Sequence, residues 1–118
     1  MMDIESLREY CLSKKGADES FPFDDETLVF KVGGKIFACI SLNQPDCLAL
    51  KCDSERVIEL RERYSFIEPA WHFNKKYWNQ IWISCITGNF VRELIDHSYC
   101  EVLKKLSKKQ LSNLLPCD

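Results

Sequence analysis

The residues best suited to recognition gather in one short run, from His72 to Ile83. This run holds a histidine, two adjacent lysines, two asparagines and four large aromatic side chains, and from Trp78 onward it has the β-branched and aromatic composition of a strand. Lysine and asparagine at the tip of such a strand can contact phosphate oxygens or the edges of bases. We therefore expect a cationic, aromatic tip on a sheet, which favours recognition over catalysis.

Signals for catalysis are weak along the rest of the chain. A nucleophile needs a base and an orienting group beside it, and the sequence contains only two histidines, His72 and His97. The glycine patterns of a nucleophile elbow and of a phosphate-binding loop are both missing. We expect a non-enzymatic protein with no catalytic residues and no cofactor.

Two pairs of residues have some resemblance to zinc ligands. Four residues separate Cys47 from Cys52, and His97 and Cys100 are spaced to face one way on a helix. Neither pair has the C-x2-C spacing of common zinc sites, and Cys47 and Cys52 would point to opposite faces of a regular strand. We expect no metal site at these residues.

An acidic stretch, residues 16–25, surrounds the sequence Phe21-Pro22-Phe23. Carboxylate oxygens of this kind bind hard cations, but the stretch lacks the alternating ligand spacing of a calcium loop. The more ordinary interpretation is a solvated loop whose two phenylalanines pack on the core. We expect that interpretation to hold.

Length and composition limit the class of protein. A chain of 118 residues has the size of one domain, and we assign residues 1–118 to it. No apolar run is long enough to span a membrane, and the acidic start is unlike a signal peptide. The seven cysteines are an odd number, and Cys39, Cys85 and Cys100 lie in apolar segments where a free thiol acts as a small hydrophobe. We expect a reduced, cytoplasmic protein with no membrane partner.

Charge is distributed unevenly along the chain. The net charge is −2, yet residues 1–60 carry −5 (7 Lys/Arg against 12 Asp/Glu) and residues 61–118 carry +3 (9 against 6). This asymmetry is within ordinary surface variation, but it predicts that a phosphate-bearing partner would meet the second half of the chain.

Hydrophobic periodicity indicates a mixture of helices and strands. The Gly33-Gly34 pair joins the first two strands as a hairpin, and the first three strands form a meander. Trp78 and Trp82 share one strand face and are expected to pack under a helix. The predicted helices are 3–14, 55–64, 89–106 and 108–115, and the predicted strands are 27–32, 35–42, 48–52 and 78–83.

The order of these elements, with four short motifs, resembles the MmcQ/YjbR family over about residues 3–110. The motifs are Lys51-Cys52-Asp53, Pro69-Ala70-Trp71, His72-x-Asn74-Lys75-Lys76-x-Trp78-Asn79 and Glu93-Leu94-Ile95-Asp96-His97-Ser98-Tyr99. The resemblance implies an α+β, CyaY-like fold, with a curved antiparallel sheet and helices packed on one face. It also implies the double-wing description of this bacterial family and a role in binding DNA.

This chain departs from the family pattern near its end. Many members have a Leu-Pro-Lys-Lys element after the long helix, whereas this chain has Leu106-Ser107-Lys108-Lys109. The positive charge is kept, whereas serine replaces the proline that would make this turn rigid.

The resemblance suggests a weak DNA-binding protein whose basic wings contact the phosphate backbone. If three or four phosphates are neutralised, log affinity should fall with log salt at a slope of about −3. Asparagines of the tip would add hydrogen bonds to the backbone or to a base edge. The predicted contacts are Lys31 and Lys35 on the first hairpin, Asn74, Lys75, Lys76 and Asn79 on the tip, and Lys104, Lys105, Lys108 and Lys109 after the long helix.

Two other functions remain open at this stage. The same tip would suit an acidic protein surface, with Trp71 and Phe73 as anchors and Lys75 and Lys76 as steering charges. A small-molecule or metal binder, based on the acidic residues 18–26, ranks third.

Overall fold

The computed structural model describes residues 2–70 and 73–114. Over these residues, six strands form one antiparallel sheet in the order β1-β2-β3-β4-β6-β5. The strands are β1 (Ala17–Ser20), β2 (Thr27–Val32), β3 (Lys35–Ser41), β4 (Gln44–Lys51), β5 (Ile67–Pro69) and β6 (Trp78–Trp82). The helices are α1 (Ile4–Leu12), α2 (Ser54–Arg63), α3 (Gly88–Leu103) and α4 (Lys108–Leu114), with a short 3₁₀ turn, η1 (Ile83–Cys85), before α3.

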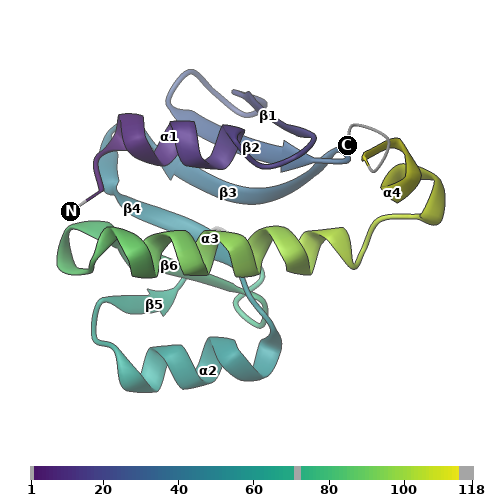
Figure 1. Ribbon diagram of the computed structural model, residues 1–118. Helices are drawn as coiled ribbons and strands as arrows, with labels where there is room; N and C mark the ends of the chain where they lie inside the picture. The colour runs from purple at the N-terminus through teal and green to yellow at the C-terminus, as the bar shows by residue number, and fades with distance from the viewer. Residues whose placement is uncertain (1, 71–72, 115–118) are drawn as a thin grey trace.

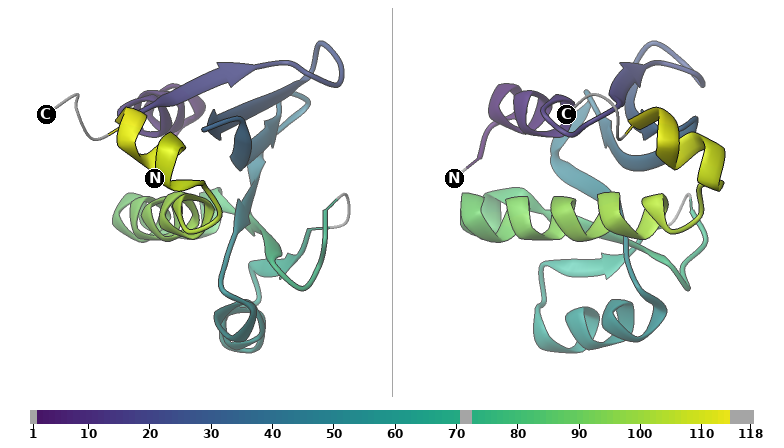
Figure 2. Two further views of the ribbon diagram at one scale, coloured as in Figure 1. Left: turned by 90° about the vertical axis from the view of Figure 1, so that its right-hand side faces the viewer. Right: turned by 45° about the vertical axis from the view of Figure 1, so that its right-hand side comes forward.

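The helices lie on one face of a curved sheet, as Figure 1 shows for α3, which crosses the strands between α1 and α2. The left view of Figure 2 shows the sheet from its end, with the helices on one side and the opposite face open. Between the layers lies the apolar core, which includes Phe30, Phe37, Leu48, Val91 and Ile95. The α+β fold with helices on one face of a curved antiparallel sheet is therefore confirmed. Among the described residues, no helix is long and apolar enough to cross a membrane.

The predicted helices and central strands are confirmed, but two edge strands were missed. Strand β1 occupies part of the acidic stretch that was expected to be a loop, and β5 lies between the predicted helix 55–64 and the predicted strand 78–83. The first is only four residues, Ala-Asp-Glu-Ser, and the second is three residues ending in proline. Neither has the alternation that marks a half-buried strand, so pairing with a neighbour determines their conformation.

A bulge in β3 changes which of its side chains face the core. Phe30 pairs with Ala38 and Lys31 pairs with Ile36, so the register skips Phe37. Phe37 and Ala38 are therefore both buried in the core, while Ile36 turns to the side that carries Lys31. Strict alternation along the predicted strand 35–42 would place Ile36 on the face of Ala38 and Ile40, and the bulge breaks that alternation.

Several aromatic side chains lie on the open face of the sheet rather than under the helices. In β6, Asn79 and Ile81 point to the core, so Trp78 and Trp82 point to the opposite side, and Trp78 stacks on Phe73 with ring centroids 4.3 Å apart. The expectation that both tryptophans pack under a helix was therefore wrong.

The acidic stretch and two of the cysteines also differ from expectation. Phe21 and Phe23 are 46% and 66% exposed instead of being packed on the core. Cys39 is buried as predicted, whereas Cys85 and Cys100 are exposed. An apolar residue type in a short segment does not by itself identify the buried face.

Candidate nucleic-acid interface

Strand register brings three lysine-bearing segments to one end of the sheet. Val32 pairs with Lys35 across the β2–β3 turn, and Ala38 pairs with Leu50, so the turn lies beside the end of β4. Lys51 at that end pairs with Trp78, the first residue of β6, which directly follows the tip. Both predicted wings therefore project from the same end of the sheet.

The ends of α3 and α4 are held against the β2–β3 turn. A Cβ atom added at Gly33, where φ is +58°, would lie 2.7 Å from Cδ2 of Leu106. The Gln110 side chain donates a hydrogen bond of 3.0 Å to the Gly33 carbonyl. Figure 1 shows the end of α3, α4 and this turn together on the right-hand side. We call this region the basic end; it contains Lys31, Lys35, Lys51, Lys75, Lys76, Lys104, Lys105, Lys108 and Lys109.

Lys51 lies at the centre of the basic end and was not among the predicted contacts. Burial lowers the pKa of its ammonium group, and the positive charges of Lys105 and Lys35 lower it further. Those two lysines come from other elements, so their effect on Lys51 shows that the charges converge. The Lys51-Cys52-Asp53 motif was a signal in the sequence, but it did not show which way the lysine points.

Two predicted lysines have acidic neighbours. The Lys104 ammonium forms an ion pair with Glu101 at 2.6 Å, three residues earlier on α3. Lys31 is half-buried and lies directly opposite Asp18 in β1, a strand that was missed from the sequence. The charge of Lys31 and of Lys104 is thus partly compensated, while Lys35, Lys76 and Lys105 stand exposed.

The tip has a defined shape over the described residues 73–77. The Asn74 side chain accepts a hydrogen bond from the Lys76 amide at 3.0 Å, and its carbonyl accepts one from the Tyr77 amide at 3.0 Å. The Lys76 ammonium lies over the Tyr77 ring, 5.4 Å from its centroid. The family residues Trp71 and His72 lie outside the described residues.

Arg61 in α2 fixes the tip to the body of the protein. Its guanidinium donates hydrogen bonds to the Lys75 carbonyl and, at 3.1 Å, to the Trp78 carbonyl. It also donates to the Asn79 side chain at 2.6 Å, and the Asn79 amide donates to the Val57 carbonyl at 3.3 Å. Asn79 is only 2% exposed. The prediction that Asn79 touches DNA was therefore wrong, because its amide is used inside the protein to position the tip.

Comparison with known proteins identifies the family. A family model described as YjbR matches residues 12–101. The chain belongs to the YjbR family. It is 30% identical over 118 residues to the uncharacterized protein YjbR of Escherichia coli K12, covering 98% of this chain and 92% of that protein. It is 32% identical over 121 residues to the uncharacterized protein YbdF of Escherichia coli O157:H7, covering 98% and 99%.

Solved structures agree with the YjbR assignment. A crystal structure from Deinococcus radiodurans, described as a DUF419 domain, has a TM-score of 0.89 at 38% identity and covers 97% of this chain and 88% of that chain. A protein from Pseudomonas syringae has a TM-score of 0.68 at 23% identity, over 82% of this chain and 96% of that chain. The second likeness shows the fold alone.

In this YjbR chain, the family motif on α3 connects elements of the scaffold. Ser98 is fully buried; its hydroxyl donates to the Phe37 carbonyl at the β3 bulge (2.5 Å) and accepts from the Lys51 amide (2.9 Å). The neighbouring His97 accepts a hydrogen bond from the Asp53 amide at 3.2 Å. Burial lowers the pKa of His97, and the nearby Arg56 lowers it further, so the neutral imidazole is the favoured form.

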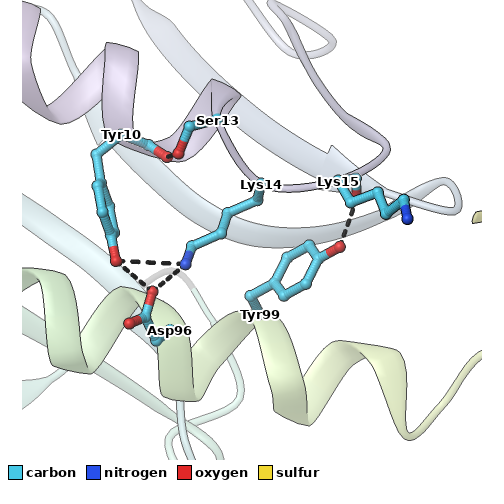
Figure 3. A network of polar contacts seen from close by, with 6 residues as sticks. All are labelled: Tyr10, Ser13, Lys14, Lys15, Asp96 and Tyr99. Atoms are coloured by element: carbon cyan, nitrogen blue, oxygen red, sulfur yellow. Dashed lines mark hydrogen bonds and ion pairs between the residues drawn. The ribbon is translucent and has the colours of Figure 1, made fainter. Parts of the chain in front are cut away.

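The same YjbR motif also ties α3 to α1, as Figure 3 shows. Asp96 accepts a hydrogen bond from the Tyr10 hydroxyl at 2.6 Å and forms an ion pair with Lys14. Tyr99 donates to the carbonyl of Lys15, just after α1. Four adjacent motif residues, Asp96 to Tyr99, thus hold α3 to α1, to the strands and to the start of α2, which gives them a structural role.

The departure from the YjbR pattern after the long helix has a structural replacement. The Ser107 hydroxyl accepts a hydrogen bond from the Gln110 amide at 3.1 Å, and the Gln110 side chain accepts one from the Ser107 amide at 2.9 Å. This reciprocal pair is a capping box at the start of α4. It orients the start of α4 in the absence of proline. Across residues 2–70 and 73–114, no three His, Cys, Asp or Glu side chains form a group that could hold a metal.

Proposed function

We propose that this YjbR protein binds duplex DNA weakly and without sequence preference, through the basic end. The observation that carries the proposal is the convergence of lysines from the β2–β3 turn, β4, the tip and the α3–α4 segment at one end of the sheet. Lysine is a point charge that attracts phosphate without geometric selectivity. A row of such charges from separate elements suits the regular phosphates of a duplex.

The polar groups of the tip support backbone contact over base readout. Reading a base requires a side-chain amide or guanidinium in bidentate contact with a base edge. Asn79 is buried, and the Asn74 oxygen is used inside the turn. Contacts from Lys35, Lys76 and Lys105 would position a duplex and carry no sequence information. The expected dissociation constant is on the order of 10⁻⁴–10⁻⁶ M at physiological salt.

We further propose a binding role without catalysis, in the cytoplasm. His97, the histidine within the described residues, has its Nε2 atom occupied by the Asp53 amide. Six cysteines of the described chain are free thiols, which suits a reducing compartment.

The test measures binding of a labelled 20-base-pair duplex by fluorescence anisotropy at several salt concentrations. The native chain should bind at low salt, with log affinity falling at a slope of about −3 against log salt. Lys35→Glu/Lys105→Glu should weaken binding at least tenfold, because two attractive charges at the centre of the surface become repulsive. The matched control is Arg63→Glu/Arg92→Glu, the same change in net charge at exposed residues of α2 and α3 on the opposite side in Figure 1.

Absence of binding at low salt would refute the proposal, as would equal weakening by the two double variants. In that case an acidic protein surface becomes the better partner for the same lysines. The tip would then contribute Phe73 as an apolar contact, although its ring already stacks on Trp78.

A further inference from the structure

The open face of the sheet contains a groove with no part in the proposed DNA contact. Its volume is about 550 Å³, within the range of about 300–1,000 Å³ typical of small-molecule sites. Phe23 of the β1–β2 loop lines one wall, and Phe73 of the tip lines another. The left view of Figure 2 shows these two segments projecting from the helix-free side of the sheet. Cys39, Cys47 and Ala49 from the central strands β3 and β4 also line the groove.

Among the described residues, the charged side chains in and beside this groove are acidic. Asp24 is a lining residue, and it accepts hydrogen bonds from the amides of Glu26 (2.9 Å) and Thr27 (2.7 Å). These bonds hold the pKa of Asp24 below its usual value, so the carboxylate stays ionised well into the acid range. On the other side, Glu68 accepts a hydrogen bond of 2.5 Å from Gln80, which also lines the groove. Lysine and arginine are missing from the described lining.

The two cysteines that line the groove, Cys39 and Cys47, have raised pKa values to which the nearby carboxylates contribute. Burial, together with a smaller contribution from the charge of Asp24, raises the pKa of Cys39 to about 11. Burial, together with a smaller contribution from Glu68, raises the pKa of Cys47 to about 11 as well. Both thiols therefore remain protonated near neutral pH, where they are weak nucleophiles and poor metal ligands. They give the groove a neutral, polarizable surface that suits apolar contact.

We propose that this groove binds a small organic cation: a protonated amine attached to an aromatic or aliphatic body. The body would lie over Cys39, Cys47 and Ala49 between the two phenylalanines. The ammonium group would be attracted by both Asp24 and Glu68 and could also contact an aromatic face. Anions, including nucleic-acid phosphates, would be repelled from this face. The groove is thus a second site, chemically opposite to the basic end, and it does not depend on DNA binding.

Three probes of similar size and different charge test this inference: phenethylamine, 2-phenylethanol and 3-phenylpropionate. Binding is followed through the backbone amide resonances of ¹⁵N-labelled protein. The ammonium probe should shift amides of groove residues such as Thr27, Cys39 and Gln80 in a saturable way, with a dissociation constant on the order of 1 mM for so small a molecule. The alcohol should bind more weakly, and the carboxylate at least tenfold more weakly than the amine.

A matched pair of neutralising variants locates the charge effect. Glu68→Gln keeps an oxygen to accept the hydrogen bond from Gln80 but removes the negative charge, and it should weaken the amine severalfold while leaving the alcohol unchanged. Glu9→Gln removes the same charge from an exposed position on α1, in the layer on the other side of the sheet, and should change neither. Equal affinities for the three probes, shifts confined to other surfaces, or an unchanged amine affinity in Glu68→Gln would each overturn the inference.

Discussion

The basic end and the groove differ in how their charge is built. Lysines at the basic end come from four separate segments and meet only because register and packing bring the segments together. The negative field of the groove comes from two carboxylates, each of which accepts hydrogen bonds from nearby groups. At the basic end, burial lowers the pKa of Lys51 and the like charges of Lys105 and Lys35 lower it further, whereas the carboxylates of the groove are stabilised by local hydrogen bonds.

This difference shows why charge along the sequence is a poor guide to charge in space. The first sixty residues carry −5 and were expected to repel a duplex. Yet Lys31, Lys35 and Lys51 of the basic end all belong to that half, while Asp24 of the same half faces the groove. Strand pairing places the lysines and the acidic residues of this half of the chain on different surfaces of the protein.

The largest expected effect follows from removing the hydroxyl that holds the scaffold behind the basic end. Ser98→Ala would leave the Phe37 carbonyl and the Lys51 amide without their partner inside the core. We expect a loss of about 2–4 kcal/mol in the free energy of unfolding, since each buried unpaired group costs about 1–3 kcal/mol. Urea denaturation measures it, with Ser84→Ala, at an exposed serine, as control. A loss below about 1 kcal/mol would show that Ser98 does not hold the basic end.

The contact between the hairpin turn and the end of α3 can be weakened with adjacent glycines as a matched pair. Gly33→Ala and Gly34→Ala both place a side chain at positive φ, which costs about 1–2 kcal/mol. The space around Gly34 is open, whereas an added Cβ at Gly33 meets Leu106. Gly33→Ala should therefore cost about 1 kcal/mol more in thermal unfolding and also weaken DNA binding, with amine binding unchanged. Equal costs would mean that Leu106 does not fix the turn.

Patterns in the sequence were sufficient for the regular parts of the fold. Periodic apolar positions predicted α1, α2, α3 and the central strands, because burial of one face imposes a period of 3.6 or 2 residues. The missed strands β1 and β5 carry no such pattern, and the bulge at Phe37 adds a residue that alternation cannot anticipate. Those features depend on long-range pairing, which local composition does not encode.

For the candidate sites, the sequence identified the charged segments but not the direction in which each side chain points. The dilysine tip and the lysines after α3 were predicted DNA contacts. The β4–β6 register places the tip at one end of the sheet, and the Gln110–Gly33 hydrogen bond places the segment after α3 near the same end. Asn79 was expected at the surface but is buried, because successive side chains of a strand point to opposite faces and a shift of one residue moves a side chain from surface to core. The groove was not predicted at all, since its walls come from a loop and a tip about fifty residues apart in the chain.

Neutralising Lys51 should affect the basic end and leave the groove unchanged. Lys51→Gln removes one positive charge beside Lys35 and Lys105, so the salt slope of DNA binding should become shallower by about 1 and the affinity should fall severalfold. The protein should be as stable as the native chain or slightly more stable, with an equal or higher free energy of unfolding. The reason is that burial and the neighbouring positive charges disfavour the ammonium form of Lys51. Arg63→Gln is the control for net charge. If Lys51→Gln and Arg63→Gln bind DNA with equal affinity, the DNA-contact surface lies away from Lys51. A change in amine binding in Lys51→Gln would show that the basic end and the groove are coupled.

Acidification should affect the two regions differently, and this is the smallest effect. The folded protein holds the pKa of His97 below the unfolded value of 6.5, so the unfolded state takes up its proton first as the pH falls. The stability supplied by neutral His97 is therefore complete above pH 6.5 and is lost as the pH falls below it. His97→Gln should remove this part of the pH dependence between pH 7.5 and 5, and comparison with the native chain cancels the contributions of His72 and the carboxylates. Over the same range Asp24 remains ionised, so amine binding at the groove should stay level. Identical pH profiles of stability for the two proteins would show that burial of the neutral His97 imidazole contributes no pH dependence to stability.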